Sequence, residues 1–378
     1  MRIINYKKEM MKEQQVIFTN DICETLHKFT NEISHDRLFM LFDTDTMIHC
    51  MPLLTTFMNE YDQAHPSAHI HTIMIGSTDT AKNIESLTEV WQALSDNHAT
   101  RHSLLINVGG GMITDLGGFA AATFKRGIKF INVATSLLGA VDAAVGGKTG
   151  INLGSLKNEI GAFAPANAVL ISTKFYESLD KENLLSGYAE MLKHGILSNE
   201  THFNDLLAFD IVNINNPETI EENYAGLLAL LEVSVNVKRS VVRQDPFENG
   251  LRKALNLGHT FGHAFETWCM RKGTPVLHGY AVAWGLVCEL IMSQQHTNLS
   301  SDVLYKVATF VKENYGPLHF TCDDYDTFFE LMKHDKKNHG DTINFTLMRH
   351  IGDVALNQTA SKEQIGAVLD IYRDLMGI

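Results

Sequence analysis

The sequence predicts an α/β N-terminal domain built on a parallel sheet, followed by a mostly α-helical C-terminal domain. Two observations lead to this prediction. Short apolar runs in the first half alternate with segments of helical spacing, which is typical of a parallel sheet covered by helices on both faces. Beyond about Ser172 the strand pattern fades, while helical spacing of apolar residues continues to the end of the chain.

Five apolar runs of the first half are expected to form strands, at residues 37–42, 69–75, 103–108, 129–133 and 168–171. The first run ends at Asp43, and the third leads directly into the triple glycine 109–111. Continuous apolar runs of this length suit strands that are buried on both faces. A helix is expected at 84–94, between the second and third runs.

Six segments of the second half carry apolar residues at helical spacing, at residues 184–197, 223–242, 256–270, 280–295, 301–315 and 363–376. A chain of 378 residues is longer than single hydrophobic cores usually become. We therefore expect two domains, residues 1–170 and 171–378.

Composition narrows the function classes. The net charge of −13 disfavours nonspecific binding to nucleic acid or to an anionic membrane, since both require a basic surface. The charged start of the chain lacks the apolar core of a signal peptide. The most apolar helical segment, 280–292, is too short to span a bilayer and contains Glu289. Five scattered cysteines without a C-x-x-C pair indicate neither disulfides nor a thiolate metal site, so a reducing cytoplasm is expected.

A glycine-rich stretch at 141–158 reads V-D-A-A-V-G-G-K-T-G-I-N-L-G-S-L-K-N. Its glycines allow a backbone to approach a ligand closely, and Lys148 adds a point charge. The phosphate-binding P-loop pattern G-x-x-x-x-G-K-[ST] fits only in part, because Asp142 stands where that pattern has its first glycine. A nucleotide triphosphatase is therefore weakly supported, and a glycine-rich surface turn is an alternative.

The triple glycine 109–111 lies at a predicted junction of a strand with a helix. Free backbone N–H groups and the helix dipole attract phosphate at such a junction. Asp43, at the end of an earlier strand, is suitably placed to accept a hydrogen bond from a ribose hydroxyl. Asp79 and Lys82 lie in a polar loop after the next strand. Nucleotide binding and a simple tight turn both remain open at this point, because the G-x-G-x-x-G fingerprint is absent.

Histidines and one carboxylate suggest a metal site. His259 and His263 share one face of a predicted helix, and His278 begins the next helix. Glu190 lies in a segment that otherwise reads as buried, and His194, four residues later, is a rival ligand. A carboxylate with two imidazoles and an open position describes a catalytic zinc-like site. The protease motif H-E-x-x-H is absent, and a purely structural histidine pair remains an alternative.

Lysines and an arginine accumulate near these motifs in an otherwise acidic chain, namely Lys148, Lys157, Lys193, Lys238, Arg252, Lys336 and Lys337. Any one of them is most simply a solvated surface residue. As a set they suit a substrate that carries carboxylate and phosphate groups.

Taken together, the segments resemble the 3-dehydroquinate synthase family, and the likeness covers nearly the whole chain. The residues that carry it are G-G-G-M-I-T-D-L-G-G-F-A-A-A-T-F-K-R-G (109–127), V-D-A-A-V-G-G-K-T-G-I-N with L-K-N (141–158), G-Y-A-E-M-L-K-H-G (187–195), L-R-K-A-L-N-L-G-H-T-F-G-H-A-F-E (251–266), L-H-G (277–279) and D-K-K (335–337).

The resemblance implies a Rossmann-like NAD-binding domain at 1–170, and a helical metal- and substrate-binding domain at 171–378. It implies a lyase that converts 3-deoxy-D-arabino-heptulosonate 7-phosphate to 3-dehydroquinate and phosphate in the shikimate pathway of aromatic amino acid biosynthesis. In that family NAD oxidises the C5 hydroxyl, phosphate is eliminated, the ketone is reduced again, and an intramolecular aldol reaction closes the ring. NAD returns unchanged, and a divalent metal, zinc or cobalt, polarises the reacting oxygens.

The family's functional residues transfer to this sequence by motif. The implied metal ligands are Glu190, His259 and His278. His263 matches the acid/base histidine. Positions that match substrate contacts are Asp142, Lys148, Asn158, Lys193, Lys238, Arg252, Asn256 and Lys336, with Lys337 as an alternative to the last. Positions that match cofactor contacts are Asp43 (or Asp45), Asp79, Lys82, Gly110, Gly111, Met112, Asp115, Thr135, Ser136, Lys148 and Lys157. Arg126 matches an arginine that reaches the phosphate from the neighbouring subunit in relatives, which implies a homodimer.

Some positions depart from the family pattern. Ala134 stands where the family usually has proline, Ser136 replaces a threonine, and Tyr280 replaces the glutamate of H-G-E. No ligand or charged substrate contact is lost. The alternatives to a dehydroquinate synthase are a sister sugar-phosphate cyclase acting on sedoheptulose 7-phosphate or a hexose phosphate, and a metal-dependent polyol dehydrogenase.

Overall fold

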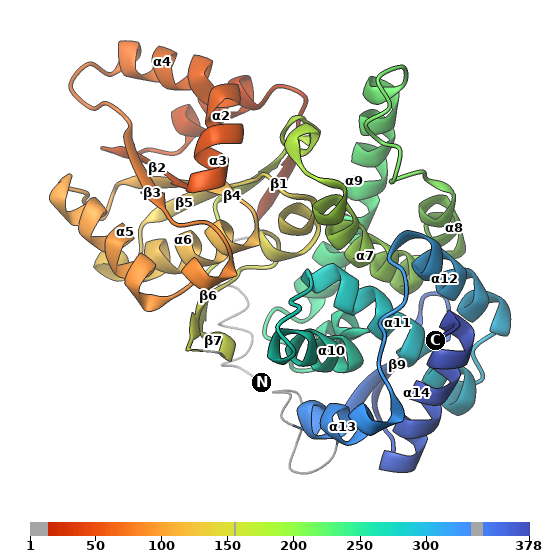
Figure 1. The fold of residues 1–378 in the computed structure, drawn as a ribbon. Coiled ribbons are helices and arrows are strands. Elements are labelled where there is room, and N and C mark those ends of the chain that lie inside the picture. Colours follow the sequence, from red (N-terminus) through yellow and green to blue (C-terminus); the bar gives the residue numbers. More distant parts are fainter. Residues whose placement is uncertain (1–13, 155, 334–342) are drawn as a thin grey trace. The chain divides into compact units, whose positions relative to one another are not determined.

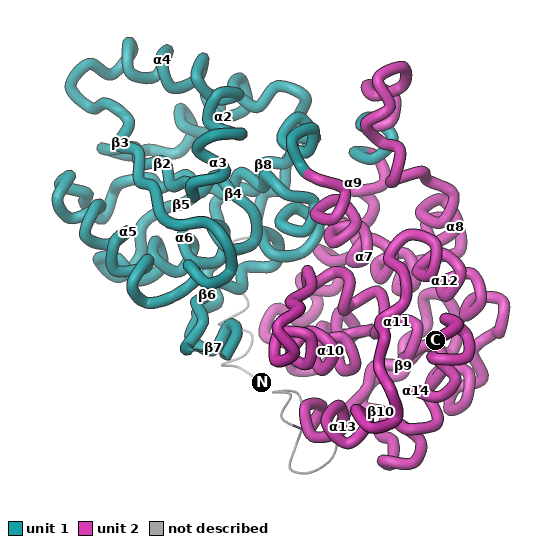
Figure 2. The backbone as a smooth tube through the Cα atoms, in the orientation of Figure 1, with its two compact units in different colours: residues 1–179, 224–228 teal, residues 180–223, 229–378 magenta. Residues whose placement is uncertain are grey.

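The computed structural model describes residues 14–154, 156–333 and 343–378. The chain divides into two compact units, which Figure 2 shows in different colours. Unit 1 comprises the residues up to 179 together with 224–228, and unit 2 comprises 180–223 and 229–378. No helix of the described residues has both the length and the apolar character needed to cross a membrane.

Unit 1 is built on a six-stranded, entirely parallel sheet with the strand order β1-β8-β5-β4-β2-β3. The strands are β1 (Gln15–Phe18), β2 (Leu38–Asp43), β3 (His71–Ile75), β4 (Leu104–Gly109), β5 (Lys129–Ala134) and β8 (Ala168–Ile171). Helices α5 (Ile84–Asp96) and α6 (Gly111–Thr123) cover one face, while α2 (Ile22–Glu32), α3 (Thr44–His49) and α4 (Thr55–Ala64) cover the other (Figure 1). Shorter turns are η1 (Met51–Leu54), η2 (Asp79–Ala81), η3 (Phe124–Arg126) and η5 (Thr173–Ser178).

The five predicted strands and the predicted helix 84–94 are confirmed, with ends that agree to within two residues. Every residue of β2, β4 and β8 is buried, as expected for strands covered on both faces. Strands β5, β4 and β2 are neighbours, so the residues that follow them gather at one edge of the sheet. Asp43, Gly109 and Ala134 mark that edge, which is where open parallel sheets bind ligands.

The P-loop interpretation of the stretch 141–158 is wrong. A P-loop leads into a helix, whereas Lys148 begins strand β6 (Lys148–Leu153) of an antiparallel hairpin with β7 (Leu156–Phe163). The residues before it form a short π-helix, η4 (Gly139–Ala143). The glycines serve a different purpose, because a Cβ atom on Gly150 would lie 2.5 Å from the Ile160 carbonyl oxygen across the hairpin.

Unit 2 is mainly helical, as predicted, with α7 (Lys181–Ser198), α8 (Glu200–Ala208), most of α9 (Ile220–Gln244), η6 (Leu251–Asn256), α10 (His259–Arg271), α11 (His278–Thr297), α12 (Ser301–Asn314), η7 (Cys322–Asp324), α13 (Tyr325–Lys333) and α14 (Lys362–Met376). The expectation that strands end with the first half is corrected by the hairpin of β9 (Asn344–His350) and β10 (Asp353–Thr359). Four residues of β9 are buried, so this hairpin contributes to the core of unit 2.

Glycines bring three helices of unit 2 into backbone contact. A Cβ atom on Gly279 of α11 would lie 1.9 Å from the carbonyl oxygen of Ser186 in α7. A Cβ atom on Gly285 of α11 would lie 2.0 Å from the carbonyl oxygen of Gly258, directly before α10. Only glycine permits such approaches, so the spacing of α7, α10 and α11 depends on these positions.

Candidate active site

Three potential metal ligands converge in unit 2, one from each of the closely packed helices. Glu190 lies in the middle of α7, His259 is the first residue of α10, and His278 is the first residue of α11. One ligand atom from each residue lies within 4.8 Å of the other two. A carboxylate oxygen and two imidazole nitrogens form the donor set of an open catalytic zinc site.

The Glu190 carboxylate divides its two oxygens between different partners. Oε1 lies 3.4 Å from Nε2 of His259 and 3.6 Å from Nε2 of His278. Oε2 contacts the ammonium group of Lys193, one helical turn further along α7. Glu190 is fully buried, and within the described part of the chain neither oxygen accepts a hydrogen bond of ordinary geometry. Oε1 is therefore the oxygen that faces the two imidazole nitrogens.

Each histidine is held through its other ring nitrogen. Nδ1 of His259 lies 3.0 Å from the Leu257 carbonyl oxygen, so this nitrogen carries the hydrogen and Nε2 presents a lone pair. Nδ1 of His278 lies 3.2 Å from a carboxylate oxygen of Glu266. Such outer contacts fix the tautomer and orientation of metal-binding histidines.

The electrostatics of the cluster favour an anionic Glu190. Burial alone would raise the pKa of its carboxyl, but Lys193 and His259 outweigh that effect and hold the pKa well below its usual range. Burial alone would lower the pKa of His278, but Glu190 and Glu266 raise it to about 10. The carboxylates thus attract positive charge to this point, which a proton or a metal ion can supply.

The two other histidines of the sequence motifs occupy different positions. The ring centroid of His263 lies 5.3 Å from that of His259 and 5.9 Å from that of His278, so His263 borders the ligand group. His194 is fully buried in α7 but is not a member of the ligand group. The geometry favours His278 over His194 as the third potential ligand.

The predicted anion-binding residues of unit 2 are buried rather than solvated. Lys193, Lys238 and Arg252 have exposures of 1%, 5% and 2%. Arg252 donates to the Pro246 carbonyl oxygen at 2.6 Å, and its backbone N–H donates to Asp245 at 3.0 Å. Asn256 donates to Glu248 at 3.1 Å.

The predicted nucleotide residues of unit 1 lie at the carboxyl edge of the sheet. Gly110 is the N-cap of α6, and no side chain caps this helix end within the described residues. A Cβ atom on Gly110 would lie 2.8 Å from Oγ of Ser136, so the two loops approach each other closely here. Thr135 extends the strand ladder through its N–H, which donates to the Gly109 carbonyl oxygen at 3.1 Å. Gly111, Met112 and Asp115 lie in the first turns of α6.

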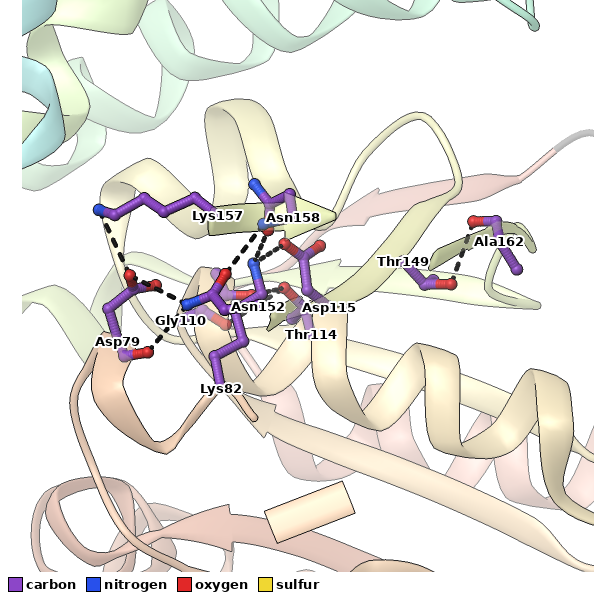
Figure 3. Close-up of polar contacts among 11 residues, drawn as sticks. Asp79, Lys82, Gly110, Thr114, Asp115, Thr149, Asn152, Lys157, Asn158 and Ala162 are labelled. Carbon is purple, nitrogen blue, oxygen red and sulfur yellow. Dashed lines mark hydrogen bonds and ion pairs between the residues drawn. The ribbon is translucent and has the colours of Figure 1, made fainter. Parts of the chain in front are cut away.

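Lys82 organises a polar network beside this edge, shown in Figure 3. Its ammonium group lies 2.5 Å from both Oδ2 of Asp115 and Oδ1 of Asn158. Asn152 donates to the side chain of Asp79 at 3.3 Å and accepts from the backbone N–H of Asn158 at 2.9 Å. The network ties the loop after β3, helix α6 and the β6–β7 hairpin together. Lys157 lies 3.3 Å from Asp79, and both side chains are about half exposed.

Asp43 has a structural function that the sequence did not indicate. Its Oδ1 atom caps α3 by accepting hydrogen bonds from the backbone N–H of Thr46 at 2.7 Å and from its hydroxyl at 3.0 Å. Burial raises the pKa of Asp43. Asp45, the alternative ribose contact, is exposed in the first turn of the same helix.

The remaining predicted residues lie in various surroundings. Asp142 is half-buried in η4, and Lys148 is exposed at the start of β6. Arg126 is exposed, with a φ angle of 69°. Lys336 and Lys337 lie outside the described residues.

Known proteins resemble this chain over most of its length. Residues 72–186 match the family described as 3-dehydroquinate synthase N-terminal, and residues 187–338 match 3-dehydroquinate synthase C-terminal. A 3-dehydroquinate synthase of Parabacteroides distasonis is 48% identical over 368 residues, which cover 97% of this chain and 100% of that protein. The chain belongs to the 3-dehydroquinate synthase family. A 3-dehydroquinate synthase of Streptococcus equi is 31% identical over 373 residues, covering 98% of both proteins.

Solved structures of other cyclases share the fold of this dehydroquinate synthase family member. The 2-epi-5-epi-valiolone synthase of Streptomyces hygroscopicus, with NAD⁺ and Zn²⁺ bound, has a TM-score of 0.83 at 23% identity and covers 96% of this chain and 98% of its own. A 2-deoxy-scyllo-inosose synthase complexed with carbaglucose-6-phosphate, NAD⁺ and Co²⁺ has a TM-score of 0.78 at 20% identity, with coverages of 94% and 95%.

Two departures from the 3-dehydroquinate synthase pattern are accommodated locally. The ring of Tyr280 packs edge-on against that of Tyr315, with 5.1 Å between the ring centroids. An aromatic contact thus stands where the family pattern has a glutamate. Oγ of Ser136 accepts from the Gly139 N–H at 3.1 Å.

Sequence reasoning missed Glu266 and Asn152. Glu266 lies on α10 and its partner His278 on α11, so spacing within one helix gives no signal for this contact. Asn152 has no signal either, because its contacts depend on the hairpin turn.

Proposed function

We propose that the chain converts 3-deoxy-D-arabino-heptulosonate 7-phosphate to 3-dehydroquinate and phosphate with bound NAD and a divalent cation, zinc or cobalt. The observation that carries this proposal is the convergence of Glu190, His259 and His278 beside Lys193, in a chain that is 48% identical to a 3-dehydroquinate synthase.

The residues of unit 2 fit a divalent cation. Glu190 is fully buried with an oxygen directed at two imidazole nitrogens, and both histidines are oriented through their opposite nitrogens. Two nitrogens and one oxygen leave a position for a substrate oxygen, as in catalytic zinc sites. Glu190, His259 and His278 would hold the metal.

The residues of unit 1 fit a dinucleotide. The carboxyl edge of the sheet offers an uncapped helix N-terminus at Gly110, where phosphate groups bind. Gly110, Gly111 and Met112 would lie against the pyrophosphate, and Lys82 adds a buried cation. Thr135, Ser136 and Asp115 border the same edge. We propose that Asp43, Asp79, Lys148 and Lys157 also contact the NAD cofactor.

When bound, NAD accepts and returns a hydride, while the metal polarises the oxygen on the reacting carbon. The protein supplies the remaining parts. His263 borders the ligand group without belonging to it, so it is positioned to move a proton as general acid and base. Buried Lys193, Lys238 and Arg252 hold the anionic ends of the substrate, because a desolvated cation gains most from an anionic partner. Asp142, Asn158, Asn256 and Lys336 complete the proposed substrate contacts.

A homodimer is part of the proposal, and two features of unit 1 support it. The β6–β7 hairpin exposes large apolar side chains, since Leu153, Leu156 and Phe163 are 51%, 55% and 46% exposed. Lys125 and Arg126 both have positive φ angles, 48° and 69°, which are uncommon for non-glycine residues and give this turn a defined shape. We propose that a second copy covers the hairpin and that Arg126 reaches its substrate. Sedimentation of a Leu156→Asp variant tests this: a variant that remains a dimer contradicts the interface.

The proposed location is the cytoplasm. It is supported by five cysteines that are all free in the structure, and a reducing compartment keeps thiols in that state.

A coupled phosphate-release assay tests the reaction. Phosphate should appear from the heptulosonate phosphate only in the presence of NAD, chelator should abolish it, and NADH should not accumulate. Turnover of sedoheptulose 7-phosphate instead would identify a sister cyclase, and accumulating NADH would identify a dehydrogenase. His263→Ala should lose activity and keep its metal, whereas His259→Ala should lose both.

A further inference from the structure

Glu289 is a buried acid to which the proposed reaction assigns no function. It lies three turns into α11, in a run from Ala281 to Ser293 in which every residue is buried. Its exposure is 0%, and it is the only charged residue of that run. Because burying a charge is costly unless specific groups stabilise it, Glu289 needs a physical explanation.

Glu289 accepts hydrogen bonds from two backbone N–H groups, one on either side of a proposed metal ligand. One carboxylate oxygen accepts from the N–H of Gly258 at 2.6 Å, and the other accepts from the N–H of Thr260 at 2.9 Å. The residue between these two donors is His259. The carboxylate therefore holds the backbone on both sides of the ligand.

The N-terminus of α10 cannot provide this cap from its own sequence. Its N-cap is Gly258, which has no side chain and adopts a left-handed conformation with a φ angle of 82°. The first N–H groups of a helix lack intrahelical partners, and helix ends fray when these groups are not satisfied. Glu289 supplies the acceptors from α11, and the positive end of the helix dipole stabilises its charge.

The packing of α11 directs Glu289 to this place. Gly285 lies four residues earlier on the same face of α11, and a Cβ atom there would be 2.0 Å from the Gly258 carbonyl oxygen. A Cβ atom on Gly258 would in turn lie 2.8 Å from Leu286. The two backbones are in contact at this point, so the carboxylate reaches the helix end directly.

We propose that Glu289 is a positioning residue for the metal site: by clamping the backbone on both sides of His259, it sets where the first residue of α10 places its ring. This inference rests on the proposed metal site. It goes beyond helix capping, because it assigns the carboxylate an effect on metal affinity as well as on stability.

The test compares metal affinity in full-length variants. Glu289→Gln keeps the size of the side chain but leaves one oxygen, so only one of the two N–H groups finds an acceptor. The dissociation constant for cobalt(II), measured by competition with a chromophoric chelator, should rise about 10- to 100-fold, as is typical when the partner of a ligand is removed. The visible absorption bands of the bound cobalt should shift, because the ring of His259 changes position.

Ser293→Ala is the matched control. Ser293 is equally buried on α11, where it donates to the Glu289 carbonyl oxygen at 2.6 Å and accepts from the Met348 N–H at 3.0 Å. This variant should unfold at a lower temperature yet keep wild-type cobalt affinity. An equal loss of affinity in Ser293→Ala would reduce the effect to general destabilisation and overturn the proposal.

Wild-type cobalt affinity in a folded Glu289→Gln variant would also overturn it. If Glu289→Gln does not fold, Glu289→Asp takes its place. This variant keeps the charge but shortens the side chain by one methylene. An undiminished cobalt affinity would again contradict the proposal. His259→Ala in the same titration separates the two hypotheses. If this variant binds cobalt as the wild type does, the proposed metal site itself is wrong; if it does not, a negative result for Glu289 refutes only the positioning function.

Discussion

Gly279→Ala should disrupt the metal site through helix packing alone. Gly279 follows His278 in α11 and lies against Ser186, one turn before Glu190 in α7. The added Cβ atom would lie 1.9 Å from the Ser186 carbonyl oxygen, whereas ordinary contacts begin at 3.4 Å. Because that neighbour is helix backbone, which cannot rotate away, α11 has to move by about 1.5 Å. The Gly279 N–H would also lose its hydrogen bond to the Ser186 hydroxyl.

Overpacking of this kind costs about 1–3 kcal/mol. For a unit of about 150–250 residues, that cost corresponds to a fall of roughly 2–12 °C in the unfolding temperature. The effect on the metal should be larger, since ligand distances tolerate shifts of only about 0.2 Å. We therefore expect Gly279→Ala to fold with a lowered melting temperature and to have lost most of its affinity for zinc.

Gly366→Ala is the matched control for this experiment. Gly366 lies in α14 of the same unit, where the nearest atom to an added Cβ is 3.9 Å away on Tyr325. Replacing a helical glycine in open space should stabilise the protein by about 0.5–1 kcal/mol. Differential scanning calorimetry and competition with a zinc-binding dye measure both effects. Wild-type melting and zinc affinity in Gly279→Ala would refute the packing explanation.

Three further predictions concern other residues. Glu266→Gln should weaken zinc binding about 10- to 100-fold with little change in secondary structure, because the His278 ring loses its carboxylate partner; unchanged affinity in the dye assay would contradict this. Lys82→Met should lower the urea midpoint by an amount equivalent to about 3–5 kcal/mol, because it leaves the largely buried Asp115 carboxylate without its cation. An unchanged midpoint would show that the pair is solvated. In native protein at pH 8, Ellman's reagent should react with exposed Cys322 and not with Cys50. Burial raises the pKa of the Cys50 thiol to about 12, and only the thiolate is nucleophilic. Rapid modification of Cys50 would contradict its burial.

The parallel sheet could be predicted because its central strands are buried on both faces. A strand such as Leu38–Asp43 has to be apolar throughout, so a short continuous run ending in a polar residue is enough to identify it. Strand Gln15–Phe18 escaped detection, because it is only four residues long and none of them is fully buried. Strand β7 was missed for a different reason. Leu156–Phe163 is almost entirely exposed, so burial imposes no alternation on its sequence.

The metal site shows what helical spacing can and cannot predict. Spacing pairs His259 with His263, since both lie on one face of α10. The structure instead groups His259 with His278 and Glu190, and His263 lies beside them. Which residues join His259 as ligands depends on how α7, α10 and α11 pack against one another through their glycines. This packing is tertiary structure, which helical spacing does not predict. The family resemblance supplied the ligand set that spacing alone left open.

Glu289 illustrates a signal that the sequence contained. A single acid in a long apolar helix is either exposed at an edge or buried with specific partners. The sequence alone does not distinguish these cases, because the partners are backbone N–H groups of another helix, and backbone groups carry no sequence signature.

The distribution of buried positive charge connects the fold to the proposed reaction. Among the described residues, Lys82, Lys193, Lys238 and Arg252 are the only lysines and arginines that are buried, and the sequence motifs assign all four to cofactor or substrate. Buried cations are poor stabilisers, since desolvation offsets most of their attraction to a partner. The net charge of −13 does not explain their burial either. Lysines and arginines could pair with acidic residues at the surface without losing their hydration. Within the described part of the chain Lys193 forms an ion pair with Glu190, and a divalent cation on Glu190 would leave that pair with net positive charge. The proposed phosphorylated substrate is an anion that would restore the balance, and the burial of these cations would strengthen their attraction to it.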